Sequence, residues 1–297
     1  MKIYVLGCGG MLGAYVYKHF TSKGHDVLAT DIDVNAPWLQ FMDVRDYHAM
    51  HYEMSEFRPD VIMNLAALTD LEECEEYAGD ALATNTVGSA NCAALAAKFK
   101  IPYVYISTAG IFDGRQEDYG DHGIPNPICI YAKGKYWGEL IAQTYEKHIV
   151  LRCGWQMGSC AKDKKFVGKI LKQLKKGATE LNVVQDKLGT PTYVKDFTLQ
   201  IEKLLETETY GVFNAVCKGA ASRYDVAVEL LRLMGLQDKI KVNAVDSSFW
   251  AKEYYAPRPR SEKLITTKLD SLKLNVMRTW QEALAEYVSE NPEFFTI

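Results

Sequence analysis

The sequence lacks the features that mark several large classes of protein. No apolar stretch approaches the roughly 20 residues that a membrane-spanning helix needs, so we expect no membrane segment. The formal net charge is −4 and no basic stretch alternates with aromatic residues, which argues against a nucleic-acid partner. The chain opens on a strand-like segment without a cleavable signal pattern. These absences predict a cytoplasmic globular protein.

Disulfide and metal-binding patterns are missing as well. The seven cysteines are scattered without a Cys-x-x-Cys pair, as is typical of reduced, buried thiols. Of the six histidines, His48 and His51 lie on a polar helical stretch, where we expect them to be solvated. We therefore predict no metal site.

What is present is an alternation of strand and helix patterns through the first half of the chain. Residues 61–65 and 103–107 are near-continuous apolar runs, as expected of parallel strands buried on both faces. Residues 81–98 between them read as an alanine-rich helix, and residues 149–152 as a further strand. The alternation predicts an α/β fold with a doubly wound parallel sheet of the Rossmann type.

Beyond Gly154 the alternation of strands and helices becomes irregular, which indicates a smaller lobe packed against the sheet. We expect a Rossmann domain over 1–155, with segments near 192–214 returning to it, and a substrate-binding lobe over 156–297. The expected helices lie near 166–176, 195–205, 224–234 and 279–287, and the expected strands near 181–184, 211–215 and 240–245.

A glycine-rich turn, residues 7–13, stands between the first strand and a helical pattern. Gly7 permits the tight turn, Gly10 lets backbone N–H groups approach a pyrophosphate, and Gly13 allows close packing of helix on strand. The spacing is Gly-x-x-Gly-x-x-Gly instead of Gly-x-Gly-x-x-Gly, so a plain tight turn is the alternative.

The second strand, residues 25–31, ends in Asp31, close to the expected distance of about 20 residues from the glycines. A carboxylate there hydrogen-bonds the adenosine ribose and repels a 2′-phosphate, which favours NADH over NADPH. An exposed strand-end aspartate is the alternative. After a short strand at 39–42, Asp43 either contacts the adenine or caps the helix that begins near Arg45.

Tyr131 is the only one of the eighteen tyrosines with a lysine four positions later, at Lys135. On a helix this spacing puts both side chains on one face. The ammonium is expected to lower the pKa of the phenol from about 10, so that Tyr131 exchanges a proton near neutral pH. Ordinary helix-surface residues would be the alternative, but Ser107 and Thr108 upstream and the glycine turn favour chemistry.

Further short motifs follow in order along nearly the whole chain. They are Asn-Leu-Ala-Ala-Leu-Thr (64–69), Ser-Thr-Ala-Gly-Ile-Phe-Asp-Gly (107–114), the Pro-to-Glu segment around Tyr131 (127–139), Arg-Cys-Gly-Trp (152–155), Asp-Lys-Leu-Gly-Thr-Pro-Thr (186–192) and Ala-Pro-Arg-Pro (256–259). With the glycine turn, this set resembles the dTDP-4-dehydrorhamnose reductase family of the extended short-chain dehydrogenase/reductases.

The resemblance implies a role for each matching residue. Tyr131 would be the general acid, Lys135 its electrostatic partner and a ligand of the nicotinamide ribose, and Thr108 the hydroxyl that holds the substrate carbonyl. Trp155 would pack on the sugar of the substrate, with a core aromatic as the alternative, and Ala109 would lie near the sugar. Arg258 is expected at the diphosphate, because its planar guanidinium can bond two oxygens at once. The expected cofactor lining comprises Gly7, Gly10, Met11, Leu12, Gly13, Asp31, Asp43, Val44, Leu65, Ala66, Ala67, Ile106, Tyr131 and Lys135.

The chain also departs from the family pattern. Ala109 and Gly110 stand where the family has Asp-Tyr, and Met11 replaces a common glutamine. Glu262 falls where a serine usually follows the Arg-Pro pair. Tyr15 occupies a position that is acidic in members with an interfacial magnesium, consistent with no metal here.

We therefore expect a reductase of a nucleotide-linked 4-keto-6-deoxyhexose that uses NADH or NADPH and takes its proton from Tyr131. The resemblance implies a nucleotide-sugar partner and allows a homodimer. Two alternatives keep the same fold: a non-catalytic NAD(P)-binding regulatory subunit, and a sugar-nucleotide epimerase with tightly bound NAD.

Overall fold

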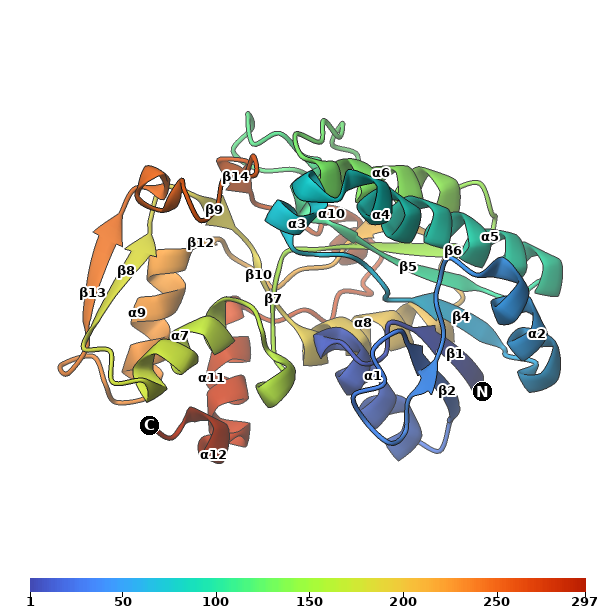
Figure 1. Ribbon diagram of the computed structural model, residues 1–297, viewed down its shortest axis with the longest axis horizontal. Coiled ribbons are helices and arrows are strands. Elements are labelled where there is room, and N and C mark those ends of the chain that lie inside the picture. Colours follow the sequence, from blue (N-terminus) through green and yellow to red (C-terminus); the bar gives the residue numbers. More distant parts are fainter.

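A seven-stranded parallel sheet forms the centre of the protein in the computed structural model, which describes residues 1–297 (Figure 1). In the strand order β3-β2-β1-β4-β5-β6-β11 the central strand is β4. The chain adds β2 and β3 on one side of β1 and then β4, β5 and β6 on its other side, as in Rossmann folds. The predicted fold class is confirmed. The strands are β1 (Lys2–Leu6), β2 (Asp26–Asp31), β3 (Gln40–Phe41), β4 (Val61–Asn64), β5 (Tyr103–Thr108), β6 (His148–Cys153) and β11 (Gly211–Asn214).

Helices cover both faces of this sheet (Figure 1). On one face lie α1 (Met11–Ser22) and α8 (Val194–Glu206), and on the other α2 (Tyr47–Phe57), α5 (Gly88–Phe99) and α6 (Ile130–Ala142). All residues of β4 and β5 are buried because helices pack on both sides, which explains their near-continuous apolar sequence. No helix combines the length and the apolar character that crossing a membrane demands.

The predicted helix over 81–98 is not one regular helix. After α3 (Leu71–Glu76) and α4 (Ala78–Leu82), a π-helical turn over Ala83–Val87 precedes α5. This turn directs buried Asn85 toward the loop after β4, where its side-chain amide donates to the Leu68 carbonyl and accepts from the Leu68 N–H, both at 3.0 Å. The irregular turn therefore fixes a loop of the expected cofactor site.

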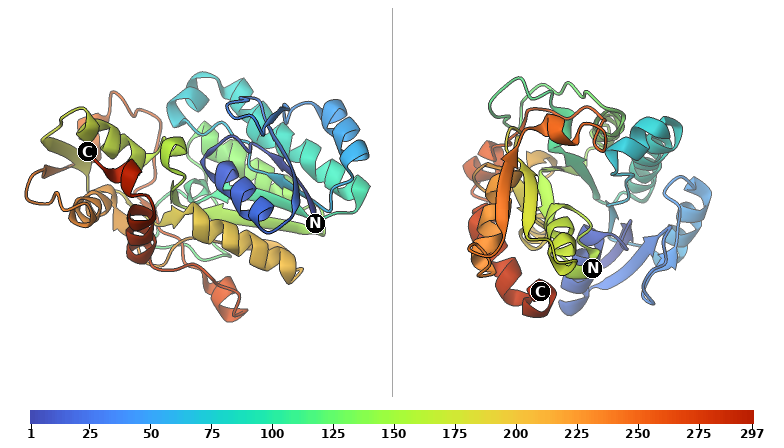
Figure 2. Two further views of the ribbon diagram at one scale, coloured as in Figure 1. Left: turned by 90° about the horizontal axis from the view of Figure 1, so that it is seen from below. Right: turned by 60° about the vertical axis from the view of Figure 1, so that its left-hand side comes forward.

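The smaller lobe begins after β6 in the chain and lies to one side of the sheet (Figure 2). A 3₁₀ turn (Ala109–Ile111) follows β5, and 3₁₀ turns at Cys160–Lys162 and Ser247–Trp250 lie within the lobe. Its other elements are β7 (Trp155–Met157), α7 (Phe166–Lys175), β8 (Glu180–Val184), β9 (Leu188–Gly189), β10 (Pro191–Tyr193), β12 (Ala221–Ser222), α9 (Arg223–Leu233), β13 (Lys241–Val245), β14 (Ser261–Glu262), α11 (Trp280–Glu290) and α12 (Pro292–Phe295). The short helix α10 (Thr267–Ser271) packs instead against β11 of the sheet.

Three later segments return to the sheet. β11 pairs with β6, and α8 packs on α1 with Glu202 accepting from His19 at 3.0 Å. In α10, the Lys268 ammonium donates to the Val212 carbonyl of β11 at 3.0 Å. The domain boundary near residue 155 stays a prediction, because the chain crosses between the two parts several times.

One hydrophobic cluster continues from the sheet into the smaller lobe. It includes Phe20 and Phe197 on the α1/α8 face and Leu230 and Tyr287 in the lobe. A separate cluster lies between the sheet and the α2/α5 face. All seven cysteines are free thiols, and six of them are buried. The shared cluster packs the lobe firmly against the sheet.

Candidate active site

The glycine turn lies where β1 ends, against the loop that follows β4. Gly7 has a φ of +75°, and a Cβ there would stand 2.4 Å from the Ala66 nitrogen. A Cβ on Gly13 would stand 2.4 Å from the Cys8 Cα. Larger residues are therefore excluded at both positions, by backbone conformation and close approach at Gly7 and by close approach at Gly13.

Gly10 is the N-cap of α1, and no side chain caps this helix terminus. The first turn of α1 carries no acidic residue either. Its backbone N–H groups thus remain available to an anion, and the helix dipole favours negative charge at this end. The turn fits the pyrophosphate of a dinucleotide.

Asp31 is the last residue of β2, and its carboxylate hydrogen-bonds the backbone of the glycine turn. One carboxylate oxygen accepts the Gly9 N–H and the other accepts the Asp33 N–H, both at 2.9 Å. The carboxylate thus lies at the turn, where a ribose bound along the turn would approach it. Nearby, Leu65, Ala66 and Ala67 are partly exposed at the end of β4.

Asp43 is not the N-cap of α2. That helix is capped by Asp46, whose side chain accepts the Ala49 N–H at 2.9 Å. Asp43 pairs instead with Arg45 at 2.6 Å, and hydrogen bonds from this arginine lower the pKa of the Asp43 carboxyl. Its predicted adenine contact stays a prediction, and Val44 beside it is buried under Gly88.

Glu139 joins α6 to two strands, through an ion pair with Arg152 of β6 and a hydrogen bond from Ser107 of β5. The Ser107 hydroxyl donates to one oxygen of Glu139 at 2.6 Å, and Arg152 of β6 donates to the other at 2.6 Å. Glu139 is fully buried and Arg152 is 5% exposed. Since Tyr131, Lys135 and Glu139 follow one another at four-residue spacing, this contact aligns the whole α6 face with β5.

Lys135 is 3% exposed, and its ammonium lies 4.3 Å from the centre of the Tyr105 ring. The Tyr105 hydroxyl donates to the Lys135 carbonyl at 3.1 Å, so ring and helix hold each other. Burial lowers the pKa of Lys135 to about 8. The lysine is still mainly protonated at neutral pH.

Tyr131 lies beside Thr108, as predicted, but its ionisation differs from the sequence prediction. Burial raises the pKa of the Tyr131 phenol well above its usual value, and the neighbouring Thr108 hydroxyl opposes this only in part. The expected lowering of the Tyr131 pKa was wrong, because the loss of hydration on burial dominates. The phenol is therefore protonated at neutral pH and suited to donate a proton.

The predicted substrate residues meet at the boundary between sheet and lobe. The Trp155 indole N–H donates to Glu262 at 2.6 Å, and the Arg223 guanidinium lies 3.8 Å from the centre of an indole ring. Arg258 forms a two-bond ion pair with Glu72, at 2.7 and 2.9 Å. Ala109 is only 1% exposed, in a small apolar cluster with Phe112, Tyr119 and Leu264.

Sequence reasoning missed Arg223 and the part played by Glu139. Arg223 is the first residue of α9, directly after the capping serine Ser222, and nothing in its local sequence distinguishes it from a helix-surface arginine. From the sequence, Glu139 was included only as the last residue of the segment 127–139 and was assigned no role. Its spacing from Tyr131 and Lys135 was the signal that could have identified it.

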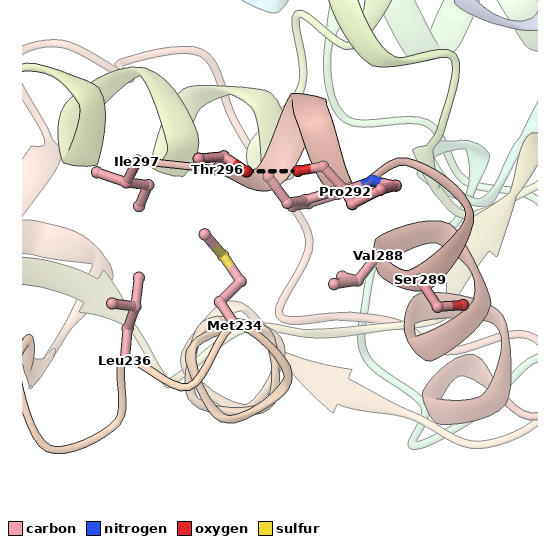
Figure 3. Close-up of a pocket in the computed structure, with 8 residues that line it drawn as sticks. Met234, Leu236, Val288, Ser289, Pro292, Thr296 and Ile297 are labelled. Atoms are coloured by element: carbon pink, nitrogen blue, oxygen red, sulfur yellow. Dashed lines mark hydrogen bonds between the residues drawn. The ribbon is translucent and has the colours of Figure 1, made fainter.

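A surface hollow of about 420 Å³ lies elsewhere (Figure 3). Figure 3 shows Met234 and Leu236 after α9 facing the C-terminal residues Thr296 and Ile297. None of the predicted site residues lines it. It is therefore separate from the candidate active site.

Comparisons with known proteins show which family the chain is similar to. A family model, the RmlD substrate binding domain, matches residues 1–292. Spore coat polysaccharide biosynthesis protein SpsK of Bacillus subtilis is 29% identical over 293 residues, covering 97% of both chains. A dTDP-4-dehydrorhamnose reductase of Aggregatibacter actinomycetemcomitans is 30% identical over 296 residues, covering 95% of this chain and 97% of the relative. Methionine adenosyltransferase 2 subunit beta of Danio rerio is 26% identical, covering 94% and 87%.

Solved structures show the same similarity. A dTDP-4-dehydrorhamnose reductase ortholog from Clostridium acetobutylicum has a TM-score of 0.89 and 32% identity, covering 98% of this chain and 100% of its own. The dTDP-4-dehydrorhamnose reductase of Bacillus anthracis, in complex with NADP, has a TM-score of 0.88 and 26% identity, covering 97% and 99%. The chain therefore belongs to the dTDP-4-dehydrorhamnose reductase family, the family of the RmlD substrate binding domain.

Proposed function

We propose that the protein is an NAD(P)H-dependent reductase of a nucleotide-linked 4-keto-6-deoxyhexose, with dTDP-4-dehydro-L-rhamnose as the best single candidate. The observation that carries the proposal is the arrangement along β1, β4 and β5. These strands are neighbours and parallel, so the glycine turn, Leu65–Ala67 and Thr108 meet at one edge of the sheet. Tyr131 and Lys135 face the same edge from α6.

Each side chain of this group suits one part of a carbonyl reduction. The bound cofactor would supply the hydride to the ketone carbon. As negative charge grows on the ketone oxygen, the Thr108 hydroxyl and the Tyr131 phenol donate hydrogen bonds to it. Tyr131 then transfers its proton, and the charged Lys135 stabilises the phenolate that remains.

The proposed preference for NADH over NADPH rests on Asp31. Its carboxylate lies at the glycine turn, and a negative charge there disfavours a 2′-phosphate. We propose a preference for NADH that does not exclude NADPH. The family relative from Bacillus anthracis binds NADP, so both cofactors belong in the assay.

A second candidate function is a regulatory subunit that binds NAD(P) without turnover. It is favoured by the similarity to methionine adenosyltransferase 2 subunit beta. The retained Thr108, Tyr131 and Lys135 support the enzyme instead. An epimerase, the third reading, would keep its cofactor through purification, which absorbance of the purified protein would reveal.

The test is a panel of 4-keto-6-deoxy sugar nucleotides, with oxidation of NADH and NADPH followed by absorbance. We expect steady oxidation with at least one member of the panel. The reductase proposal is wrong if the purified protein binds NAD(P)H but oxidises it with no keto-sugar nucleotide. That result would support the regulatory subunit.

A further inference from the structure

Glu262 brings a carboxylate to the candidate active site, and the reaction proposed above does not use it. The residue ends β14, and one of its oxygens accepts the Trp155 indole N–H at 2.6 Å. The other oxygen, Oε1, accepts no hydrogen bond from any residue. It stands 3.3 Å from the point where a Cβ on Gly110 would lie, and Thr108 Oγ1 is 3.5 Å from that point. The free carboxylate oxygen and the hydroxyl that we assign to the substrate carbonyl therefore both approach the same point beside Gly110.

Gly110 makes room for this carboxylate. A side chain at residue 110 would begin in tight contact with Glu262 Oε1, and a tyrosine, which the related motif carries, would have to displace it. Ala109 lies in its apolar cluster and brings no polar atom of its side chain to this place. The polar contacts that the chain lacks at 109 and 110 are thus replaced by an acceptor from β14.

Trp155 and Arg223 hold the carboxylate in position. The Arg223 guanidinium lies 3.8 Å from the centre of a Trp155 ring and 5.0 Å from that of Phe166, and Gly189 packs directly against the same indole. Two neighbours therefore cover the indole and limit its use as a stacking surface. Arg223 donates no hydrogen bond to another residue, so its charge remains available near Glu262.

The electrostatics agree with an acceptor role. Burial raises the pKa of Glu262, while the Trp155 hydrogen bond and the Arg223 charge oppose that rise. In turn, burial lowers the pKa of Arg223 to about 10, and Glu262 opposes this. Each charge supports the other without a direct ion pair.

We propose that Glu262 is a specificity-determining residue, whose free carboxylate oxygen accepts a hydrogen bond from a hydroxyl group on the hexose of the substrate. The inference rests on the proposed function, because it assigns this oxygen to the same keto-sugar nucleotide. A hexose that lacks the hydroxyl leaves a half-buried carboxylate unsatisfied, and a sugar with its own carboxylate is repelled. The site therefore selects a neutral, hydroxylated 4-keto sugar.

The test compares kcat/KM for a 4-keto-6-deoxyhexose nucleotide that the wild type reduces with kcat/KM for its 2-deoxy and 3-deoxy analogues. We expect the wild type to lose about ten- to a hundredfold with one analogue, the range for a hydrogen bond to a charged group. Glu262→Ala should lose a similar factor on the parent substrate and little more on that analogue. Glu262→Gln keeps an acceptor for Trp155 and should fall between.

A purely structural role would give a different pattern. If Glu262 only holds Trp155, then Glu262→Ala and Trp155→Phe lower kcat/KM for parent and analogues by the same factor, and the inference is overturned while the reductase activity stands. Equal kcat/KM of the wild type for all three substrates overturns it as well. If the wild type reduces no keto-sugar nucleotide, the proposed function fails, and the inference with it.

A second variant tests the role of the same oxygen without changing Glu262 itself. Gly110→Ala places a methyl against Glu262 Oε1 and should reproduce the loss of discrimination seen in Glu262→Ala. Gly79→Ala is the matched control, because a Cβ at Gly79 meets no atom within 4 Å. Unchanged discrimination in Gly110→Ala, with the protein folded, would contradict the placement of the carboxylate.

Discussion

Two side chains of the candidate site carry or exchange a proton where burial opposes charge. The Lys135 side chain is buried, and its ammonium lies over the Tyr105 ring. Tyr131 stays protonated, because a phenolate at this position would be poorly hydrated. A buried charged group costs stability in the free protein, and in the proposed reaction it would stabilise the charge that develops beside it. The effect of each residue on stability and on turnover can be measured in single variants.

Lys135→Met should abolish turnover and stabilise the protein. The lowered pKa of Lys135, about 8 against an ordinary 10.5, corresponds to a destabilisation of roughly 3 kcal/mol while the lysine is charged. Methionine removes this cost but also the contact with Tyr105, so we expect a net gain of about 1–3 kcal/mol at pH 7. Urea unfolding of both proteins measures it.

The gain should depend on pH in a defined direction. The unfolded chain holds the Lys135 proton up to about pH 10.5 and the folded protein only to about pH 8. Between these values the unfolded state binds more protons, so the wild type gains stability relative to Lys135→Met as pH rises. The advantage of the variant is full below pH 8 and vanishes near pH 10.5. Lys133→Met, on the same helix, should show no such trend; a pH-independent gain in Lys135→Met would contradict the account.

Asp31→Ser should change cofactor preference toward NADPH. The substitution removes an acceptor for the ribose and the charge that repels a 2′-phosphate. The ratio of kcat/KM for NADH to that for NADPH should fall by about tenfold or more. Asp33→Ser, two residues later and exposed, is the control and should leave the ratio unchanged. A wild type that strongly prefers NADPH would show that the role given to Asp31 is wrong.

At the scale of elements, a buried ion pair between Glu139 and Arg152 joins α6 to β6. In the wild type, Arg152 Nη2 lies 2.6 Å from Glu139 Oε1. Arg152→Met would leave the Glu139 carboxylate buried without this partner. Breaking such a pair costs about 3–5 kcal/mol, and chemical denaturation should show a loss of this size. Arg232→Met is the control, because its pair with Glu229 is exposed on α9 and should be worth less than about 1 kcal/mol. Equal losses would mean that the buried pair does not secure α6.

Most elements could be predicted from periodicity, because parallel strands buried on both faces and amphipathic helices leave clear patterns. Residues 166–176 and α7, Phe166–Lys175, agree almost to the residue. The π-helical turn at Ala83–Val87 could not be predicted, because its cause is the fit of Asn85 to a distant loop. The N-cap of α2 could not be assigned from the sequence, because Asp43 and Asp46 both suit a cap locally, and only the pairing of Asp43 with Arg45 separates them.

Candidate site residues could be proposed from sequence where a local pattern marks them. Tyr131 and Lys135 are four residues apart on a helix, and Thr108 ends a strand. Contacts between sequence-distant residues were beyond reach. Glu262 meets Trp155 across more than a hundred positions of sequence, and Arg223 joins them from a third element. The ionisation of Tyr131 was misjudged for a related reason, since burial comes from the whole fold and is absent from a spacing argument.

At the scale of the whole molecule, Arg258 joins the smaller lobe to the sheet. Its guanidinium pairs with Glu72 of α3, and the neighbouring Ala256 N–H donates to the same carboxylate at 3.2 Å. Lys165 makes a second link, to the Thr69 hydroxyl at 2.9 Å. The predicted diphosphate contact of Arg258 would therefore share its guanidinium with Glu72.

Arg258→Met should raise KM for the sugar nucleotide by about tenfold or more, because it removes a charged donor and a link between the lobes. KM for NAD(P)H should change little, since the glycine turn is untouched. Arg260→Met, exposed and two residues away, is the matched control. A similar rise in both KM values would mean that Arg258 acts by holding the fold together and not by contacting the nucleotide.

The central claim is that Tyr131 supplies the proton in the reduction of a keto-sugar nucleotide. The most direct test compares NAD(P)H oxidation by wild type and Tyr131→Phe with one substrate from the panel, and with Tyr136→Phe on the same helix as control. The account predicts that Tyr131→Phe lowers kcat by about 10²-fold or more while its affinity for NAD(P)H stays near that of the wild type. Near-normal turnover of Tyr131→Phe would contradict it.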